Sequence, residues 1–168
     1  MKTLIDYLKN GEIELFQQAY PKIANKNDEE LFEEAIKREQ LSIVRFLLKE
    51  SSYLRFRLKK PHMFLHDACE LGNKEMVRLL LEYGSNIEQK DDGGFTPLMR
   101  AVFSRNLNTV QLLIQHGANI YVKDSYQNTI LHMASVLKSF SVVSYFVHLV
   151  PSLLNTENKF GETPLFIA

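Results

Sequence analysis

The stretch GFTPLMRA at residues 94–101 decides the fold, because it recurs along the chain at a spacing of 33 or 34 residues. It returns as QNTILHMA at 127–134 and as GETPLFIA at 161–168, and fainter copies lie upstream at 64–68 and 31–35. A second, apolar segment keeps the same phase through four copies: IVRFLL at 43–48, MVRLLL at 76–81, TVQLLI at 109–114 and VVSYFV at 142–147. Two landmarks in one register predict a repeat protein, whose units must stack to share a core.

Each copy carries the start and stop signals of two short helices. Thr96 is suited to cap free backbone N–H groups, and Pro97 fits the first position of a helix. Gly84 and Gly117 follow the second helix, where glycine adopts the left-handed conformation without strain. A small residue in the first helix lets the second helix lie close, and the four copies supply Ala35, Ala68, Ala101 and Ala134.

This pattern resembles the ankyrin repeat over almost the whole chain. The segments GSNI at 84–87 and GANI at 117–120 are similar to the family's Gly-Ala-Asp segment, and Asp91 and Asp124 occupy its turn-opening aspartate position. The resemblance implies an all-α solenoid of stacked helix-turn-helix units with projecting hairpin loops, in a single domain over 1–168. We expect N-terminal capping helices over 1–25, repeats over 26–59, 60–90, 91–123 and 124–157, and a partial terminal repeat over 158–168.

The chain departs from the family pattern in two places. Only Gly72 keeps the glycine between the two helices, while Glu39, Arg105 and Lys138 replace it elsewhere at about 1 kcal/mol each if that backbone is left-handed. The chain also stops inside an expected opening helix. Three explanations stay open: the last turn folds back as a cap, the sequence is a segment of a longer protein, or another chain covers that end.

Composition excludes several classes of protein. The 168 residues are 45% apolar and 24% charged, which is typical of a folded domain rather than a disordered chain. Twenty basic side chains balance twenty acidic ones, so no net field favours nucleic acid or an anionic membrane. No signal-peptide pattern or spanning stretch of about 20 apolar residues occurs. We expect an intracellular protein of the cytoplasm or nucleus.

No motif indicates catalysis, so we predict a non-enzymatic chain without cofactor, metal or small-molecule substrate. No His-Glu-x-x-His motif occurs among the five histidines, and the single cysteine, Cys69, is predicted to be buried in a first helix. His66 and His132 stand at equivalent repeat positions. The ankyrin resemblance implies that both tie a helix start to the backbone of a neighbouring loop.

Candidate binding residues follow from the stack, because hairpin tips project side by side and form a concave surface with the first helices. We expect their side chains to be free of packing duties, and aromatic groups at turns to act as anchors. The tips supply Lys90, Asp91, Asp92, Phe95, Asp124, Tyr126, Gln127, Lys159 and Phe160. The first helices supply Asp67, Arg100, Phe103 and Met133.

A basic stretch with Arg57, Lys59 and Lys60 is expected in the loop that joins the first two full repeats. It is either a contact for an acidic partner or nuclear-import factor, or a solvated hairpin whose charges Glu50 and Glu82 offset.

The predicted function is a non-catalytic module that binds and masks another protein. The chain resembles stand-alone inhibitors of the inhibitor-of-NF-κB family and their truncated viral relatives, the vankyrins, which implies a Rel-type transcription factor as partner. Two alternatives stay open, namely the ankyrin segment of a larger scaffold or adaptor and a host-directed effector. No nucleic-acid or membrane partner is expected.

Overall fold

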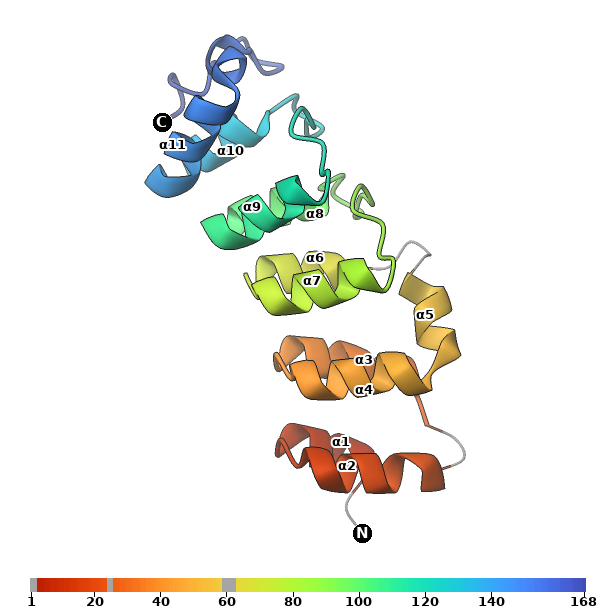
Figure 1. Cartoon of the computed structure of the whole chain (residues 1–168). Helices are drawn as coiled ribbons and strands as arrows, with labels where there is room; N and C mark the ends of the chain where they lie inside the picture. Colours follow the sequence, from red (N-terminus) through yellow and green to blue (C-terminus); the bar gives the residue numbers. More distant parts are fainter. Residues whose placement is uncertain (1–2, 24–25, 59–62) are drawn as a thin grey trace.

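The computed structural model describes residues 3–23, 26–58 and 63–168, which form a stack of antiparallel helix pairs (Figure 1). This arrangement confirms the predicted all-α solenoid, while its division into repeats stays a prediction. In each pair the first helix lies behind the second in Figure 1. The pairs are α1 (Leu4–Lys9) with α2 (Ile13–Ala19), α3 (Asp28–Lys37) with α4 (Leu41–Glu50), α6 (Phe64–Glu70) with α7 (Lys74–Glu82), α8 (Pro97–Phe103) with α9 (Leu107–Gln115), and α10 (Ile130–Val136) with α11 (Phe140–Leu149).

The expected capping residues begin these helices. The Thr96 hydroxyl accepts the Met99 N–H at the start of α8, where Pro97 takes the first helical position. Thr129 caps α10 in the same way. The second Thr-Pro pair, Thr163-Pro164, differs, because residues 164–167 form a turn rather than the expected helix.

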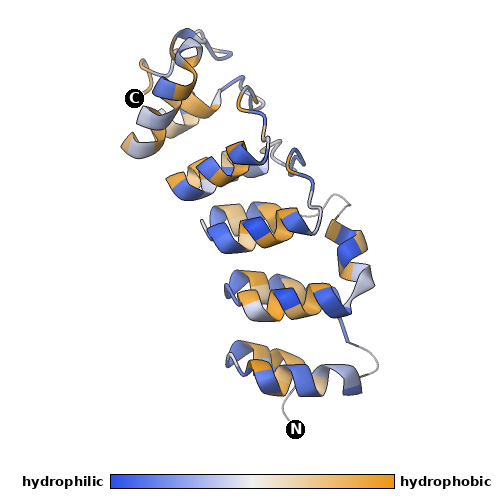
Figure 2. Ribbon diagram, viewed as in Figure 1, coloured by the Kyte–Doolittle hydropathy of each residue, from blue (hydrophilic) through white to orange (hydrophobic). Residues whose placement is uncertain are grey.

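A continuous apolar core runs along the stack. Ala35, Ala68, Ala101 and Ala134 are all fully buried, as the close approach of paired helices requires. Figure 2 shows hydrophobic and hydrophilic residues alternating along α3, α4, α6 and α7, which is the pattern of helices buried on one side. Each pair buries its apolar stripe against the next pair, so neighbouring units stabilise one another.

The segment after α4 is a helix, and the prediction of a loop there was wrong. Helix α5 (Ser52–Leu58) stands across the ends of the neighbouring pairs in Figure 1. Leu54 and Leu58 are spaced i, i+4 and are both buried, so one face of α5 packs on the core. Residues 51–58 contain no glycine, whereas Gly84 and Gly117 turn the chain into hairpins at later positions with φ angles of 91° and 88°.

The turns between paired helices adopt the left-handed conformation that the repeat pattern indicated. The φ angle is 69° at Gly72 and 55°, 55° and 53° at Glu39, Arg105 and Lys138. Amide side chains fasten some of these turns to the neighbouring unit. Asn106 donates through Nδ2 to the Gly72 carbonyl at 2.8 Å, and Asn73 donates to the Glu39 carboxylate at 2.8 Å.

The outer side of the last pair is apolar. Phe140, Leu165 and Phe166 are 83%, 80% and 76% exposed, and helices α10 and α11 contain no Asp, Glu, Lys or Arg. Among the residues that the structure describes, no helix is long and apolar enough to span a bilayer.

Candidate functional site

Side-chain oxygens at equivalent positions hold the hairpin tips together. Asp91 accepts the Gly93 and Phe95 N–H groups at 2.9 Å through Oδ1, and Asp124 accepts those of Tyr126 and Asn128 at 2.8 Å. The expectation that tip side chains have no structural duty was therefore wrong for Asp91 and Asp124. Each carboxylate thus accepts two N–H groups of its own turn and holds the conformation of that hairpin.

Asn158 does the same for the third tip, a role that the sequence analysis missed. Its Oδ1 accepts the Phe160 and Glu162 N–H groups at 2.9 and 3.0 Å. Asn158 lies 34 residues after Asp124, so the repeat spacing itself was the signal. Its Nδ2 also donates to Asn128 at 2.9 Å, which joins the second and third tips.

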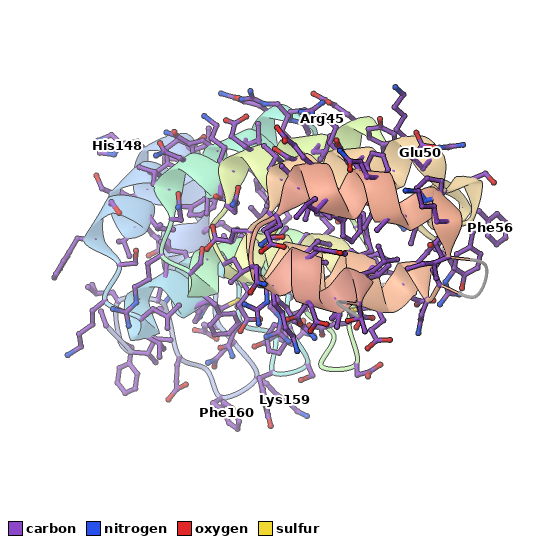
Figure 3. All side chains as sticks on the ribbon, turned by 90° about the horizontal axis from the view of Figure 1, so that it is seen from below. Arg45, Glu50, Phe56, His148, Lys159 and Phe160 are labelled. Atoms are coloured by element: carbon purple, nitrogen blue, oxygen red, sulfur yellow. The ribbon has the colours of Figure 1, made fainter. Side chains whose placement is uncertain are left out.

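Two of the predicted aromatic residues meet on neighbouring tips. Tyr126 and Phe160 stack with ring centroids 6.1 Å apart, although the two side chains stay 55% and 66% exposed. The Lys159 N–H donates to the Tyr126 carbonyl at 2.9 Å and fixes the two tips side by side. In Figure 3, Lys159 and Phe160 lie at the hairpin edge, opposite Arg45 and His148 on the second helices.

The third predicted aromatic anchor does not join this pair. Phe95 is half-buried, and its ring packs edge-on against Phe103 at 5.4 Å and under the Arg100 guanidinium at 5.3 Å. Phe103 itself is 38% exposed. Phe95 therefore fastens its hairpin to α8 rather than projecting from the tip.

The first helices present a mixed inner surface. Asp67 on α6 and Arg100 on α8 are half-buried with part of each side chain in solvent. Met133, their counterpart on α10, is 6% exposed, so its predicted place on the binding surface was wrong. A thioether has no charged end to keep in water, and it gains by turning into the core. The other tip residues predicted to bind, Lys90, Asp92, Gln127 and Lys159, are exposed.

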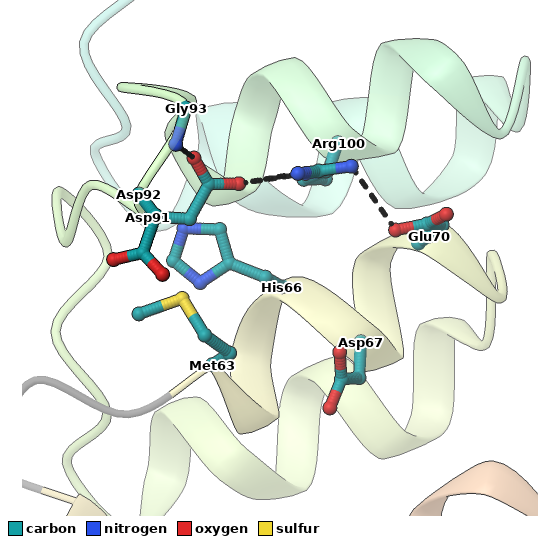
Figure 4. Close-up of a pocket in the computed structure, with 8 residues that line it drawn as sticks. All are labelled: Met63, His66, Asp67, Glu70, Asp91, Asp92, Gly93 and Arg100. Carbon is teal, nitrogen blue, oxygen red and sulfur yellow. Dashed lines mark hydrogen bonds and ion pairs between the residues drawn. The ribbon is translucent and has the colours of Figure 1, made fainter.

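One pocket gathers four of the predicted residues between α6, α8 and the first hairpin tip (Figure 4). Arg100 joins its walls: the guanidinium lies 2.6 Å from Asp91 through Nη2 and 3.3 Å from Glu70 through Nη1. Asp67 and Asp92 line the same pocket. Glu70 was not predicted, although it stands one helical turn after Asp67.

The two half-buried carboxyl groups of this pocket are perturbed in opposite directions. Burial opposes the charge of Asp91, but hydrogen bonds from the Phe95 N–H and from Arg100 outweigh it and lower the Asp91 pKa. Burial is also the largest influence on Asp67, where the Lys37 charge does not offset it, and the Asp67 pKa is raised. The surroundings of Asp91 therefore stabilise its negative charge. Those of Asp67 do not fully offset the cost of burying its negative charge.

The basic stretch is partly neutralised. Arg57 on α5 pairs with Glu29, near the start of α3, at 2.9 Å. Glu29 is not one of the two glutamates, Glu50 and Glu82, that the solvated-hairpin alternative named. Lys59 and Lys60 lie outside the described residues.

Histidine and cysteine serve as structural groups. The Nε2 atoms of His66 and His132 contact the carbonyls of Phe95 and Glu162 at 3.0 and 2.9 Å, which confirms the predicted ties to neighbouring loops. Cys69 is buried, and burial raises the pKa of its thiol. Within the described ranges, no group of three or more His, Cys, Asp or Glu side chains could hold a metal ion.

Comparison with known families agrees with this architecture. The family model for ankyrin repeats in three copies matches residues 32–124 and 65–153. The chain belongs to the ankyrin repeat family. Ankyrin repeats imply a protein–protein interaction module, so this ankyrin repeat chain is assigned to that general class.

Curated relatives share only parts of this ankyrin repeat chain. Human protein phosphatase 1 regulatory subunit 27 is 53% identical over 34 residues, which are 20% of the chain and 22% of the relative. Two putative ankyrin repeat proteins of fowlpox virus (strain NVSL) are similar over longer stretches. FPV223 is 37% identical over 42% of the chain and 48% of its own length, and FPV034 is 33% identical over 43% and 17%. The chain thus spans less than half the length of these relatives.

Proposed function

We propose that this ankyrin repeat chain binds another protein through its hairpin face and acts, without catalysis, by covering its partner's surface. The hairpin face is defined as the tips at 91–94, 124–127 and 158–161 together with the exposed sides of α6 and α8. The observation that carries the proposal is the exposed stack of Tyr126 and Phe160 on two adjoining tips.

This aromatic pair has the properties of a binding anchor. Each ring has few rotatable bonds, so holding it against a partner loses little conformational entropy. Two hydrogen bonds hold the tips in place before a partner binds. One runs from the Lys159 N–H to the Tyr126 carbonyl, and the other from the Asn158 side-chain amide to that of Asn128. Large aromatic side chains on a preorganised surface are enriched among residues that dominate binding energy.

The aromatic pair can be tested by substitution. The double variant Tyr126→Ser with Phe160→Ser is expected to fold normally, because both side chains are mostly in solvent, and to lose at least about tenfold in partner affinity. The measurement is affinity capture from host cells with quantitative mass spectrometry, followed by titration of the purified partner. Thermal unfolding of the variant serves as the folding check.

Phe140→Ser is the control, because Phe140 is even more exposed, at 83%, but begins α11, at the end of the helices remote from the tips. Capture that survives the tip variant and is lost with Phe140→Ser would place binding on the end of the stack and contradict the proposal.

We propose two classes of partner protein, each to be tested for direct binding in purified form. A Rel-type transcription factor is supported by the resemblance to inhibitors of NF-κB that consist of little more than their repeats. Protein phosphatase 1 is supported by the identity with its regulatory subunit 27, over a stretch about as long as one repeat. Binding of either purified protein that depends on Tyr126 and Phe160 would identify the partner.

The cellular setting is part of the same proposal. We expect the chain to act inside a cell, in the cytoplasm or nucleus, where a Rel-type factor or a phosphatase would be found. The fowlpox relatives support the alternative of a host-directed effector, and the partial coverage of all relatives supports the alternative of a segment in a larger scaffold.

A further inference from the structure

The pocket on the hairpin face has an excess of hydrogen-bond acceptors. Arg100 pairs with Asp91 and Glu70, and among the described residues it is the cation that lines the pocket. Within the part of the chain that the structure describes, the Asp67 carboxylate accepts no hydrogen bond and forms no ion pair, although its backbone groups are bonded within α6. Asp92, at the tip, has an exposed carboxylate. Two carboxylates therefore face the pocket without a donor from the described chain.

A buried histidine supplies an independent sign of a missing donor. The His66 side chain is 2% exposed, and its Nδ1 has no hydrogen-bond partner among the described residues. The Phe95 carbonyl at 3.0 Å can only accept, so Nε2 carries the proton of the neutral ring and Nδ1 is left as an acceptor. Burial lowers the His66 pKa and favours this neutral form.

The matching histidine of the fourth unit shows what is absent. In His132, Nδ1 accepts the Thr129 N–H at 3.1 Å and lies 2.8 Å from the Thr129 hydroxyl. The residue three positions before His66 is Met63, which has no side-chain donor to offer. Figure 4 shows Met63 and the His66 ring lying between Asp92 and Asp67.

We propose that this pocket receives an arginine side chain of the protein partner. Arginine carries five N–H donors and no acceptor, which complements Asp67, Asp92 and the His66 Nδ1. The guanidinium is weakly hydrated and loses less than an ammonium on entering a half-buried site. Met63 provides an apolar wall for the aliphatic stem, and the pocket volume of about 210 Å³ is small for a drug-sized ligand.

The pocket can be tested without knowing the partner. The probe is the capped tripeptide Ac-Gly-Arg-Gly-NH₂, titrated against the full chain with backbone and histidine side-chain resonances followed by NMR. We expect saturable shifts at Asp67, at Gly93 and at the His66 ring nitrogens, with a spectrum elsewhere unchanged. The citrulline tripeptide has the same shape without charge and is expected to cause no saturable shift.

Variants and a lysine peptide sharpen the outcome. Asp67→Asn is expected to weaken binding of the arginine peptide by at least about tenfold, whereas Glu75→Gln, an exposed control on α7, leaves it within twofold. Equal shifts from the citrulline peptide, or equal affinity in the Asp67→Asn chain, would overturn the site. A lysine peptide that binds as tightly would overturn the assignment to arginine.

This inference rests on the proposed function, but the two fail separately. If the hairpin face does not bind the partner, capture is insensitive to Tyr126 and Phe160 while the arginine peptide still shifts the pocket. If the pocket is wrong, the peptide shifts nothing there while capture still depends on the two aromatic residues.

Discussion

Asp67 and Asp91 lie in one pocket, yet their carboxylates differ in what compensates the charge. Asp91 is locked by its own hairpin and by Arg100, so it belongs to the framework. Asp67 is half-buried, and no cation among the described residues pairs with it, so burial of its charge reduces the stability of the free protein. Functional sites commonly sacrifice stability in this way, because a group that awaits a ligand cannot be satisfied within the fold.

This difference predicts opposite effects of two isosteric substitutions. Asp67→Asn should stabilise the chain at pH 7, because the raised folded pKa means that ionised Asp67 opposes folding. Asp91→Asn should destabilise it by about 1–2 kcal/mol, because charged hydrogen bonds to Arg100 are lost. The measurement is urea unfolding of both variants and the unsubstituted chain.

The pH dependence provides the control. The Asp91 pKa is lowered by folding, so its contribution is present above the unfolded value of about 3.9 and is lost as pH falls through the folded pKa. The penalty at Asp67 is present above its raised folded pKa and disappears as pH falls below the unfolded value. Both differences should therefore shrink in acid. A destabilised Asp67→Asn chain at pH 7 would show that the carboxylate is satisfied after all.

Sequence reasoning located the pocket residues without locating the pocket. Repeat equivalence placed Asp67 and Arg100 on the same surface and found the aspartate at the first tip. It missed Glu70, although Glu70 lies 33 residues before Phe103 and so takes the equivalent position in the preceding unit. It misplaced Met133 because equivalence does not say how deeply a side chain packs. The vacant acceptor of His66 was not predicted, although Met63 stands where the repeat spacing places Thr96 and Thr129 in the later units.

At the scale of elements, the turns between paired helices differ in the residue that adopts the left-handed backbone. Some have glycine there, which adopts it without strain, and others have a residue with a side chain, which is strained. Gly72 and Arg105 adopt almost the same left-handed backbone at equivalent positions, with φ angles of 69° and 55°. An added Cβ at Gly72 would lie 2.9 Å from Asn106 Nδ2, so the neighbouring unit closes on this turn. Arg105 is exposed.

Opposite substitutions at these two turns should therefore differ in sign. Arg105→Gly should stabilise the chain by about 0.5–1 kcal/mol, because relief of left-handed strain exceeds the added entropy of the unfolded glycine. Gly72→Ala should destabilise it by about 1–3 kcal/mol through strain and the clash with Asn106. Chemical denaturation measures both. An unaltered midpoint for Arg105→Gly would mean that the turn relaxes at no cost.

Helix α5 shows where local patterns reach their limit. The sequence of residues 51–58 lacks the glycine of the later hairpins, and this was the available warning against a loop. The loop was predicted from the basic side chains, although Leu54 and Leu58 have the i, i+4 spacing of a helix. Their burial against the neighbouring units is a tertiary effect, and it decides the conformation of the segment.

For the whole molecule, the regular stack was predictable because each unit obeys the same short-range rules. It was harder to predict from the sequence which of two exposed surfaces, the hairpin face or the end of the stack, binds a partner. Both contain exposed apolar residues. The end formed by Phe140, Leu165 and Phe166 is more apolar, but the hairpin face combines a fixed aromatic pair with an acceptor-rich pocket. Shape and directional polar groups together favour the hairpin face as the surface that selects a partner.

Hydrogen-exchange mass spectrometry of the chain with its captured protein partner tests this ranking most directly. The account predicts slowed exchange at the tips 91–94, 124–127 and 158–161 and at the start of α6, with α7 and α9 unchanged. Slowed exchange confined to α11 and residues 164–168, with all three tips unaffected, would contradict it.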